Sequence, residues 1–228
     1  MAVKSVLVII SANAEWQIVA SFYQDCRLQA SVYNSWFEQI VDGKMIIFYH
    51  GGWGKISAAA TAQYAIDRWK PDLLINLGTC GGLAGRIQVG EVVLASETVV
   101  YDIYERMGDA KAAIDHYTTR LDLSWLKEPL PMEIRRARLI SADRDIDPRE
   151  IKPVMEQFQA WAADWESGAI AWVAARNQLP CLILRGVTDL VDEHDGEAYG
   201  NFGLFTDRTR GVMTRLLENL PAWLESLN

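Results

Sequence analysis

Polar or glycine-rich residues follow three apolar runs of this chain. They are Glu15 after residues 6–10, the segment Gly78–Gly82 after residues 73–77, and Thr188 and Asp189 after residues 181–187. The runs are rich in Val, Ile and Leu, which is typical of strands buried on both faces of a sheet. Ligands of open α/β sheets bind outside the carboxyl ends of the strands. We therefore expect these groups to meet at one site.

Two carboxylates are candidates for chemistry. Asp189 directly follows a buried strand, an unusual place for a carboxylate unless it is paired or takes part in a reaction. Glu166 stands at the start of an apolar helical run, where its charge also interacts favourably with the helix dipole. Asp192 and Glu193 are more typical of a solvated face. Asp189 is therefore the stronger candidate, and the role of Glu166 stays open between a ligand and the helix.

Two glycine-rich segments could approach a ligand with their backbone. In Gly78–Gly82, the missing side chains would let N–H groups come close to an oxygen-rich ligand. This segment matches neither the P-loop nor the dinucleotide-binding fingerprint. Gly51–Lys55 also precedes a helical stripe of apolar residues. An ordinary tight turn remains the alternative for both segments.

Strands and helices alternate along the chain. We expect strands at residues 6–10, 73–77, 138–141 and 181–187, with further strands within 28–50 and 89–101. We expect helices ending near residue 23 and at 55–69, 148–161, 166–176 and 209–227, and an irregular excursion at 104–135. This alternation predicts βαβ units around a mainly parallel sheet. Since no repeat, linker or low-complexity tract interrupts it, we expect residues 1–228 to form a single domain.

The composition excludes several classes of partner. The formal net charge of −8 argues against a nucleic acid or an anionic membrane surface, because both favour basic patches. No apolar run approaches the roughly 20 residues of a membrane span, and we expect no targeting segment. The three histidines and three cysteines have no metal-ligand spacing, so we expect no metal, and free thiols in a cytoplasmic location. The nine tryptophans predict a large core and a subunit interface.

Several stretches, in order and spread over most of the chain, resemble the purine nucleoside phosphorylase/nucleosidase superfamily. They are Gly52–Lys55 with the Ala-rich run after it, Lys70–Asp72, Asn76–Leu83, Val89–Val93, Asp164–Ala171 and Arg185–Asp192. Within the superfamily, they are most similar to the 5′-methylthioadenosine/S-adenosylhomocysteine nucleosidases. The resemblance implies a three-layer α/β/α fold around a mixed, partly barrel-like sheet. It also implies a homodimer, a small purine nucleoside as substrate, and no metal or organic cofactor.

The resemblance assigns roles to individual residues. Asp189 falls on the acid that shares a proton with purine N7, and Glu166 on the carboxylate that holds the ribose hydroxyls. Glu15 falls on the glutamate that activates water. The residues expected to flank the acid or the sugar are Thr188, Arg185, Thr79 and Gly81. These roles suit the chemistry, because cleavage of C1′–N9 builds an oxocarbenium-like ribose and an anionic leaving base, which need a positioned water and a proton donor.

Hydrolysis and phosphorolysis are distinguished at two positions. Phosphorylases of the superfamily carry a phosphate loop with glycine and arginine near the N-terminus, and several carry an arginine where this chain has Asn76. Here the first turn supplies Glu15, and a carboxylate disfavours a phosphate dianion, so we expect hydrolysis. A phosphorylase, a nucleosidase for another nucleoside such as futalosine, and a non-catalytic binding module remain alternatives. The presence of Asp189 and Glu166 argues against the last.

Three positions depart from the family pattern. Asp145 falls where a base-stacking aromatic residue is expected, next to Ile146, which we expect to contact the substrate. A charge does not replace an aromatic face, so the resemblance leaves the base undefined. Trp53 and Trp165 stand where smaller apolar residues are usual. We expect both to contact the substrate and to narrow the pocket for its 5′ substituent.

Overall fold

A ten-stranded mixed sheet runs through the protein, whose computed structural model describes residues 3–227. The strands are β1 (Ser5–Ile10), β2 (Gln29–Ala30), β3 (Ser35–Val41), β4 (Lys44–His50), β5 (Leu73–Leu83), β6 (Val92–Val100), β7 (Thr118–Arg120), β8 (Arg135–Ser141), β9 (Ala162–Asp164) and β10 (Cys181–Val191). The helices are α1 (Asn13–Phe22), α2 (Gly54–Trp69), α3 (Ala110–His116), the 3₁₀ turn η1 (Pro148–Glu150), α4 (Ile151–Phe158), α5 (Ser167–Arg176) and α6 (Phe202–Glu225).

Part of the sheet closes on itself. Strands β10, β6, β8, β9 and β5 pair in that order, and β10 pairs again with β5, which completes a five-stranded barrel. Strands β1, β4, β3 and β2 extend from β5 as an open sheet. The mixed, partly barrel-like fold is therefore confirmed. The longest ladders, β10 with β5 and β6 with β8, are parallel as expected, whereas β10 runs antiparallel to β6 and β5 runs antiparallel to β9.

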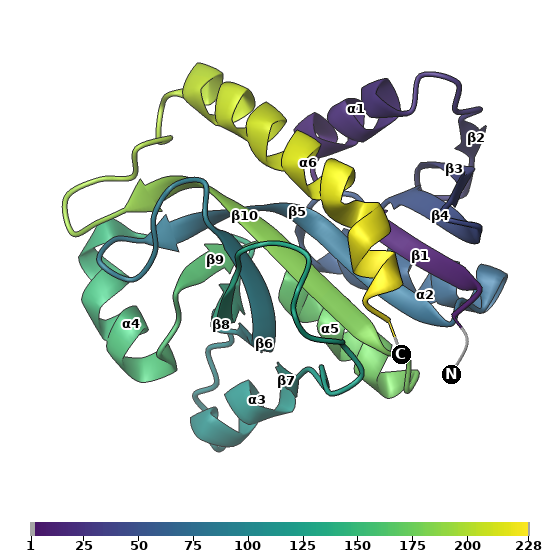
Figure 1. Cartoon of the computed structure of the whole chain (residues 1–228). Helices are drawn as coiled ribbons and strands as arrows, with labels where there is room; N and C mark the ends of the chain where they lie inside the picture. Colours follow the sequence, from purple (N-terminus) through teal and green to yellow (C-terminus); the bar gives the residue numbers. More distant parts are fainter. Residues whose placement is uncertain (1–2, 228) are drawn as a thin grey trace.

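Helices cover both faces of the sheet, as the run of apolar residues in β1 requires. Helices α2 and α5 cover one face and helices α1 and α6 the other (Figure 1). Leu7 and Ile9 pack with the alanines of α2 and α5, whereas Val6, Val8 and Ile10 pack with α1 and α6. Successive side chains of a strand point to opposite faces, so a strand covered on both sides needs apolar residues throughout. This explains why β1 reads as an unbroken apolar run.

Several boundaries differ from the sequence-based expectation. Strand β5 continues through the glycine segment to Leu83, and β10 continues through Asp189 to Val191, so neither segment is a turn. A Cβ on Gly82 would lie 2.7 Å from Ile87 and 2.8 Å from Leu190, so glycine here lets the barrel strand pack closely. Helix α6 begins at Phe202, seven residues before the expected start, and β9, α3 and β7 were not expected. The two runs expected within 89–101 form one strand, β6.

No helix within residues 3–227 combines the length and the apolar character that crossing a bilayer would require.

Candidate functional site

A cavity of about 800 Å³ opens where β1, β5, β9 and β10 end. It is lined by Ala12, Asn13, Ala14, Glu15, Trp53, Thr79, Cys80, Gly81, Asp145, Ile146, Ala163, Asp164, Trp165, Glu166, Thr188, Asp189, Val191, Ala198, Tyr199, Gly200, Asn201, Phe202 and Phe205. All the site residues expected from the sequence line it except Arg185. The prediction that the strand ends converge on one site is therefore confirmed.

Glu15 is held rigidly at the inner end of the cavity. Its Oε1 accepts hydrogen bonds from the backbone N–H of Thr79, at 2.6 Å, and from the Thr79 hydroxyl, at 2.8 Å. Its Oε2 accepts a bond from the N–H of Ala12, at 3.1 Å, which ties it to the start of α1. The residue is only 2% exposed. The carboxylate therefore has one fixed orientation, as a general base requires.

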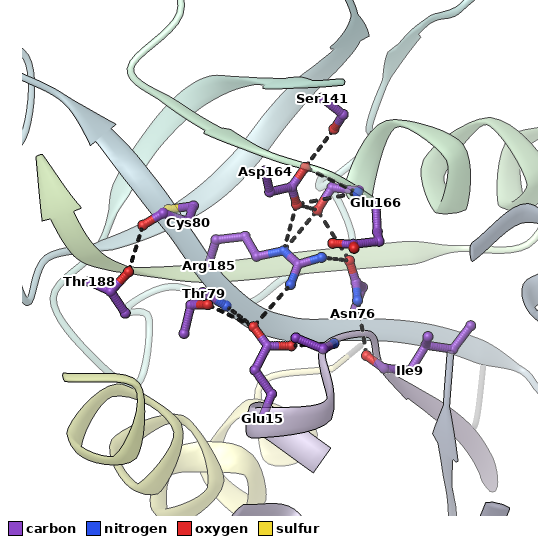
Figure 2. Close-up of polar contacts among 12 residues, drawn as sticks. Ile9, Glu15, Asn76, Thr79, Cys80, Ser141, Asp164, Glu166, Arg185 and Thr188 are labelled. Carbon is purple, nitrogen blue, oxygen red and sulfur yellow. Dashed lines mark hydrogen bonds and ion pairs between the residues drawn. The ribbon is translucent and has the colours of Figure 1, made fainter. Parts of the chain in front are cut away.

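Arg185 lies beneath the cavity, not beside Asp189. Its Nε lies 2.9 Å from Asp164 Oδ2 and donates to Ser167 Oγ at 2.8 Å, and its Nη2 donates to Asn76 Oδ1 at 2.7 Å. Its Nη1 lies 3.9 Å from Glu15 Oε1 (Figure 2). The expectation that Arg185 flanks the acid is wrong in its geometry. The guanidinium instead balances the buried charges of Asp164 and Glu15.

Gly78 makes room for this guanidinium. A Cβ at that position would lie 1.7 Å from Arg185 Nη1 and 2.9 Å from Glu15 Oε1. No side chain other than hydrogen fits in that space. The glycine that suggested a ligand-binding backbone therefore accommodates an internal ion pair.

Glu166 lies at the start of α5 and is bonded to a second helix. Its Oε1 accepts a hydrogen bond of 3.0 Å from the N–H of Gly54, the first residue of α2. Burial, together with the neighbouring charge of Asp164, raises the pKa of Glu166 from 4.5 to about 8, and Arg185 opposes this rise. Glu166 therefore binds a proton readily when the cavity is empty.

Asp189 is the acid of the outer half of the cavity. It is 7% exposed, and its Oδ1 accepts a hydrogen bond of 2.6 Å from the Thr188 hydroxyl. Burial raises its pKa above the usual 3.8, and the Thr188 hydrogen bond partly opposes that rise. The raised pKa favours the protonated form that a proton donor needs.

Two tryptophans flank Glu166. Trp53 precedes the Gly54 N–H that binds Glu166, and Trp165 precedes Glu166 itself. Their rings stack with centroids 5.1 Å apart and an interplanar angle of 23°. Trp53 remains 70% exposed, so the pair forms an apolar wall at the cavity mouth. Asp145 and Ile146 line the cavity as the sequence predicted, on the side of Asp189.

Sequence reasoning missed several residues of the site. Tyr199, Phe202 and Phe205 form an aromatic wall near Asp189, and Asp164 and Asn76 hold the guanidinium of Arg185. The spacing of Phe202 and Phe205 is helical and was the available signal, but the helix was expected only from residue 209. Within residues 3–227, no group of three His, Cys, Asp or Glu residues is arranged to hold a metal ion.

Comparison with known protein families matches residues 17–221 to the family described as the phosphorylase superfamily. This chain belongs to that superfamily. The fold, with its five-stranded barrel between two helical layers, agrees with the assignment.

Relatives within the superfamily are nucleosidases by name. The 5′-methylthioadenosine/S-adenosylhomocysteine nucleosidase of Maridesulfovibrio salexigens is 29% identical over 171 residues, which are 69% of this chain and 74% of that protein. The enzyme of the same name from Anoxybacillus flavithermus is 24% identical over 189 residues, 77% of this chain and 82% of that protein.

Solved structures share the fold of this superfamily member. The nucleosidase of that name from Neisseria meningitidis, in complex with methylthio-immucillin-A, has a TM-score of 0.79 and 21% identity over 98% of this chain and all of that one. A futalosine hydrolase mutant of Helicobacter pylori also has a TM-score of 0.79, with 18% identity over 95% of this chain and 97% of that one.

Proposed function

We propose that this protein is a purine nucleosidase: it hydrolyses the N-glycosidic bond of a nucleoside of the 5′-methylthioadenosine or S-adenosylhomocysteine type and releases the base and a thioribose. The named relatives support the substrate class. The cavity supports the reaction, because it contains three buried acidic side chains that suit different roles: Asp189, the rigidly held Glu15, and Glu166. No cofactor or metal has a part in this proposal.

Asp189 would give a proton to the leaving base. Cleavage of C1′–N9 places negative charge on the purine, and protonation at N7 lets it depart neutral. The raised pKa of Asp189 and the fixed hydrogen bond from Thr188 suit this role. We therefore assign Asp189 as the general acid.

Glu15 would activate the attacking water. The water must lose a proton as it attacks C1′, and the immobile carboxylate of Glu15 supplies a base in a fixed direction. Glu166 would accept hydrogen bonds from the ribose hydroxyls. Such bonds favour its charged form and oppose its raised pKa, and they strengthen as positive charge develops on the sugar.

The observation that favours hydrolysis over phosphorolysis is that the cavity is lined by acidic and not by basic side chains. Five of its lining residues are carboxylates, namely Glu15, Asp145, Asp164, Glu166 and Asp189, and no Lys, Arg or His is found among its lining residues within 3–227. The nearby guanidinium of Arg185 is already engaged by Asp164, Ser167 and Asn76. A phosphate dianion would find no cation to bind among these residues and would be repelled by the carboxylate of Glu15, whereas a neutral water would not.

We also propose a homodimer, formed through an exposed apolar patch beside the cavity mouth. The patch comprises Val32, Tyr33, Trp53 and Ile56, of which Ile56 is 85% exposed and Val32 75% exposed. Its two halves adjoin, because a Cβ on Gly52 would lie 3.0 Å from Asn34 Nδ2 and the Tyr33 ring packs edge-on against Tyr64 of α2. Exposed apolar patches rimmed by polar residues mark interaction sites.

We further propose that residues 1–228 form a single domain. We also propose a cytoplasmic location, which the free cysteines favour.

The test is base release, followed by chromatography, from methylthioadenosine, S-adenosylhomocysteine, adenosine, inosine and futalosine, each with and without phosphate. We expect release from one of the first two without phosphate. Strict dependence on phosphate would show that the protein is a phosphorylase. Release from futalosine alone would show that it is a futalosine hydrolase, like the Helicobacter pylori protein with the same fold. The Asp189→Asn variant serves as the inactive control.

A further inference from the structure

Strand β10 contains a bulge directly before the proposed acid. Val187 pairs with Cys80 of β5 and Asp189 pairs with Gly81, so Thr188 is an extra residue without a partner in the ladder. A bulge bends a strand and turns a side chain out of its regular direction. The bulge therefore explains why Asp189 lines the cavity, and it leaves the backbone at residues 188–190 in need of other partners.

One ion pair supplies those partners. Arg208 of α6 donates from Nη1 to the carbonyl oxygen of Thr188, at 2.9 Å. Glu197 accepts through Oε2 from the N–H of Leu190, at 3.2 Å, and its own N–H donates to the Leu190 carbonyl, at 3.0 Å. Arg208 Nη1 and Glu197 Oε2 are 2.7 Å apart. The residues before and after Asp189 are thus each bonded to one member of the same pair.

We propose that the Glu197–Arg208 pair is a positioning device for Asp189, which fixes the bulge and so aims the acid at the leaving base. The proposal rests on the assignment of Asp189 as general acid. Neither Glu197 nor Arg208 lines the cavity, so both act through Asp189 and not by touching the substrate.

The position of Arg208 on α6 joins the acid to the wall that would face the base. Phe205 lines the cavity, and Arg208 follows it by three residues on the same helical face. A movement of the start of α6 would therefore change the aromatic wall and the acid together. The Glu197–Arg208 pair therefore keeps Asp189, the proton donor, at a fixed position relative to the aromatic wall that would contact the base.

The two members of the pair act on the acid with opposite charge. Glu197 raises the pKa of Asp189 and Arg208 lowers it, in addition to the larger effect of burial. The other groups that face Asp189 are the Thr188 hydroxyl on β10, which lowers its pKa, Asp145 beyond β8, which raises it, and the hydroxyl of Tyr199, whose own pKa is raised by burial. The buried thiol of Cys80 on β5 is also near, and its own pKa is raised well above the usual value, so it is uncharged. Removal of each member of the pair should therefore shift the titration of Asp189 in opposite directions.

The experiment compares Glu197→Gln, Arg208→Gln, Arg208→Lys and the double variant with the wild type. Because an acid displaced by about 1 Å can lose up to ~100-fold in rate, we expect Arg208→Gln to lower kcat by roughly 10- to 100-fold with KM within about threefold. Arg208→Lys keeps a donor for the Thr188 carbonyl and should recover part of the loss. The basic limb of the kcat/KM profile, where Asp189 loses its proton, should move to higher pH in Arg208→Gln and to lower pH in Glu197→Gln.

Two matched controls exclude a general effect of lost surface charge. Arg215 also lies on α6 and donates to a backbone carbonyl, that of Gly90, at 2.9 Å. Glu193 lies in the same loop as Glu197 and pairs with Lys152, at 2.6 Å. Arg215→Gln and Glu193→Gln should leave kcat and the basic limb unchanged, and circular dichroism should show that every variant is folded.

Carboxyl-carbon NMR of protein labelled with ¹³C-aspartate, assigned with Asp189→Asn, measures the titration of Asp189 without any substrate. Opposite shifts in the two single variants would support the positioning role even if the wild type releases no base from the nucleosides tested, which would be a failure of the proposed function alone. An unshifted titration, a shift in one common direction, or a loss that falls entirely on KM would overturn the inference.

Discussion

The floor of the cavity and its outer end are built in contrasting ways. The floor consists of Glu15, Asn76, Asp164, Ser167 and Arg185, all buried, and every one is hydrogen-bonded or ion-paired to another. The outer end consists of Asp145, Ile146, Tyr199, Phe202 and Phe205, which come from loops and from the first turn of α6. Within residues 3–227, nothing donates a hydrogen bond to the Asp145 carboxylate. We therefore propose that the floor fixes the geometry of bond cleavage and that the outer end determines which base is accepted.

Among the substitutions considered, Gly78→Ala is expected to disrupt the floor most. The new Cβ would displace Arg185 from its place 3.9 Å from Glu15 and leave buried charges uncompensated. Breaking a buried pair costs about 3–5 kcal/mol, so we expect a loss of that order in the free energy of unfolding, and loss of turnover. Urea denaturation measures it. Gly211→Ala on α6, where a Cβ meets nothing within 4 Å, is the control, and equal stability of the two variants would contradict the role of Gly78.

Asp189→Asn tests the proposed acid, which lies beside the outer end. The amide keeps the shape of the side chain but cannot give up a proton, so we expect kcat to fall by roughly 10²- to 10⁴-fold while the melting temperature changes little. Single-turnover base release measures the loss. Near-normal turnover would remove the assignment of the acid.

Glu166 allows a test of stability against pH. Its pKa is about 8 in the folded protein and 4.5 ordinarily, so the folded state holds the extra proton between these values. Stability contributed by this group therefore falls as pH rises from about 4.5 to 8. We expect Glu166→Gln to flatten that decline and to raise the melting temperature at pH 8 relative to the wild type, although it weakens substrate binding. A decline as steep as that of the wild type would show that Glu166 does not hold a proton in the empty cavity.

The smallest effect is expected at the outer end. Asp145→Asn removes a charge without changing shape, so we expect turnover on the best substrate to change by only a few-fold. The ratio of kcat/KM between 6-amino and 6-oxo nucleosides should change more, because an amide can both donate and accept hydrogen bonds whereas a carboxylate only accepts. An unchanged ratio would place the selection of the base elsewhere. The same change in turnover on all nucleosides would show that Asp145 belongs functionally with the floor.

The sequence predicted those parts of the fold whose pattern is local. The apolar run of β1 and the alanine stripe of α2 each identify an element from its own residues, because both faces of β1 and one face of α2 are buried. Strand β9, with three residues, is too short to carry a periodic pattern, and it exists because β5 and β8 offer it partners. The closure of the barrel came from the resemblance, since no local pattern encodes it.

Among the site residues, too, those marked by a local pattern were predicted and those that depend on the tertiary fold were not. Glu15, Glu166 and Asp189 were found because a carboxylate beside an apolar run is conspicuous. Arg185 was predicted to lie beside Asp189 but binds Asp164 instead, because the direction of its side chain depends on the space left by Gly78 on the adjacent strand. Tyr199 was missed because it lies in the connection between β10 and α6, where no periodic pattern marks it.

The hydrogen bond from Gly54 to Glu166 has a consequence for how the enzyme behaves on dilution. Gly54 is joined directly to Trp53, a member of the apolar patch proposed to bind a second copy, so one short segment would serve both the proposed ribose-binding carboxylate of Glu166 and the proposed subunit contact. Separation of the subunits would free Trp53 and loosen the N–H that holds Glu166. Specific activity would then fall with decreasing protein concentration, and the dissociation of the dimer could be read directly from initial rates.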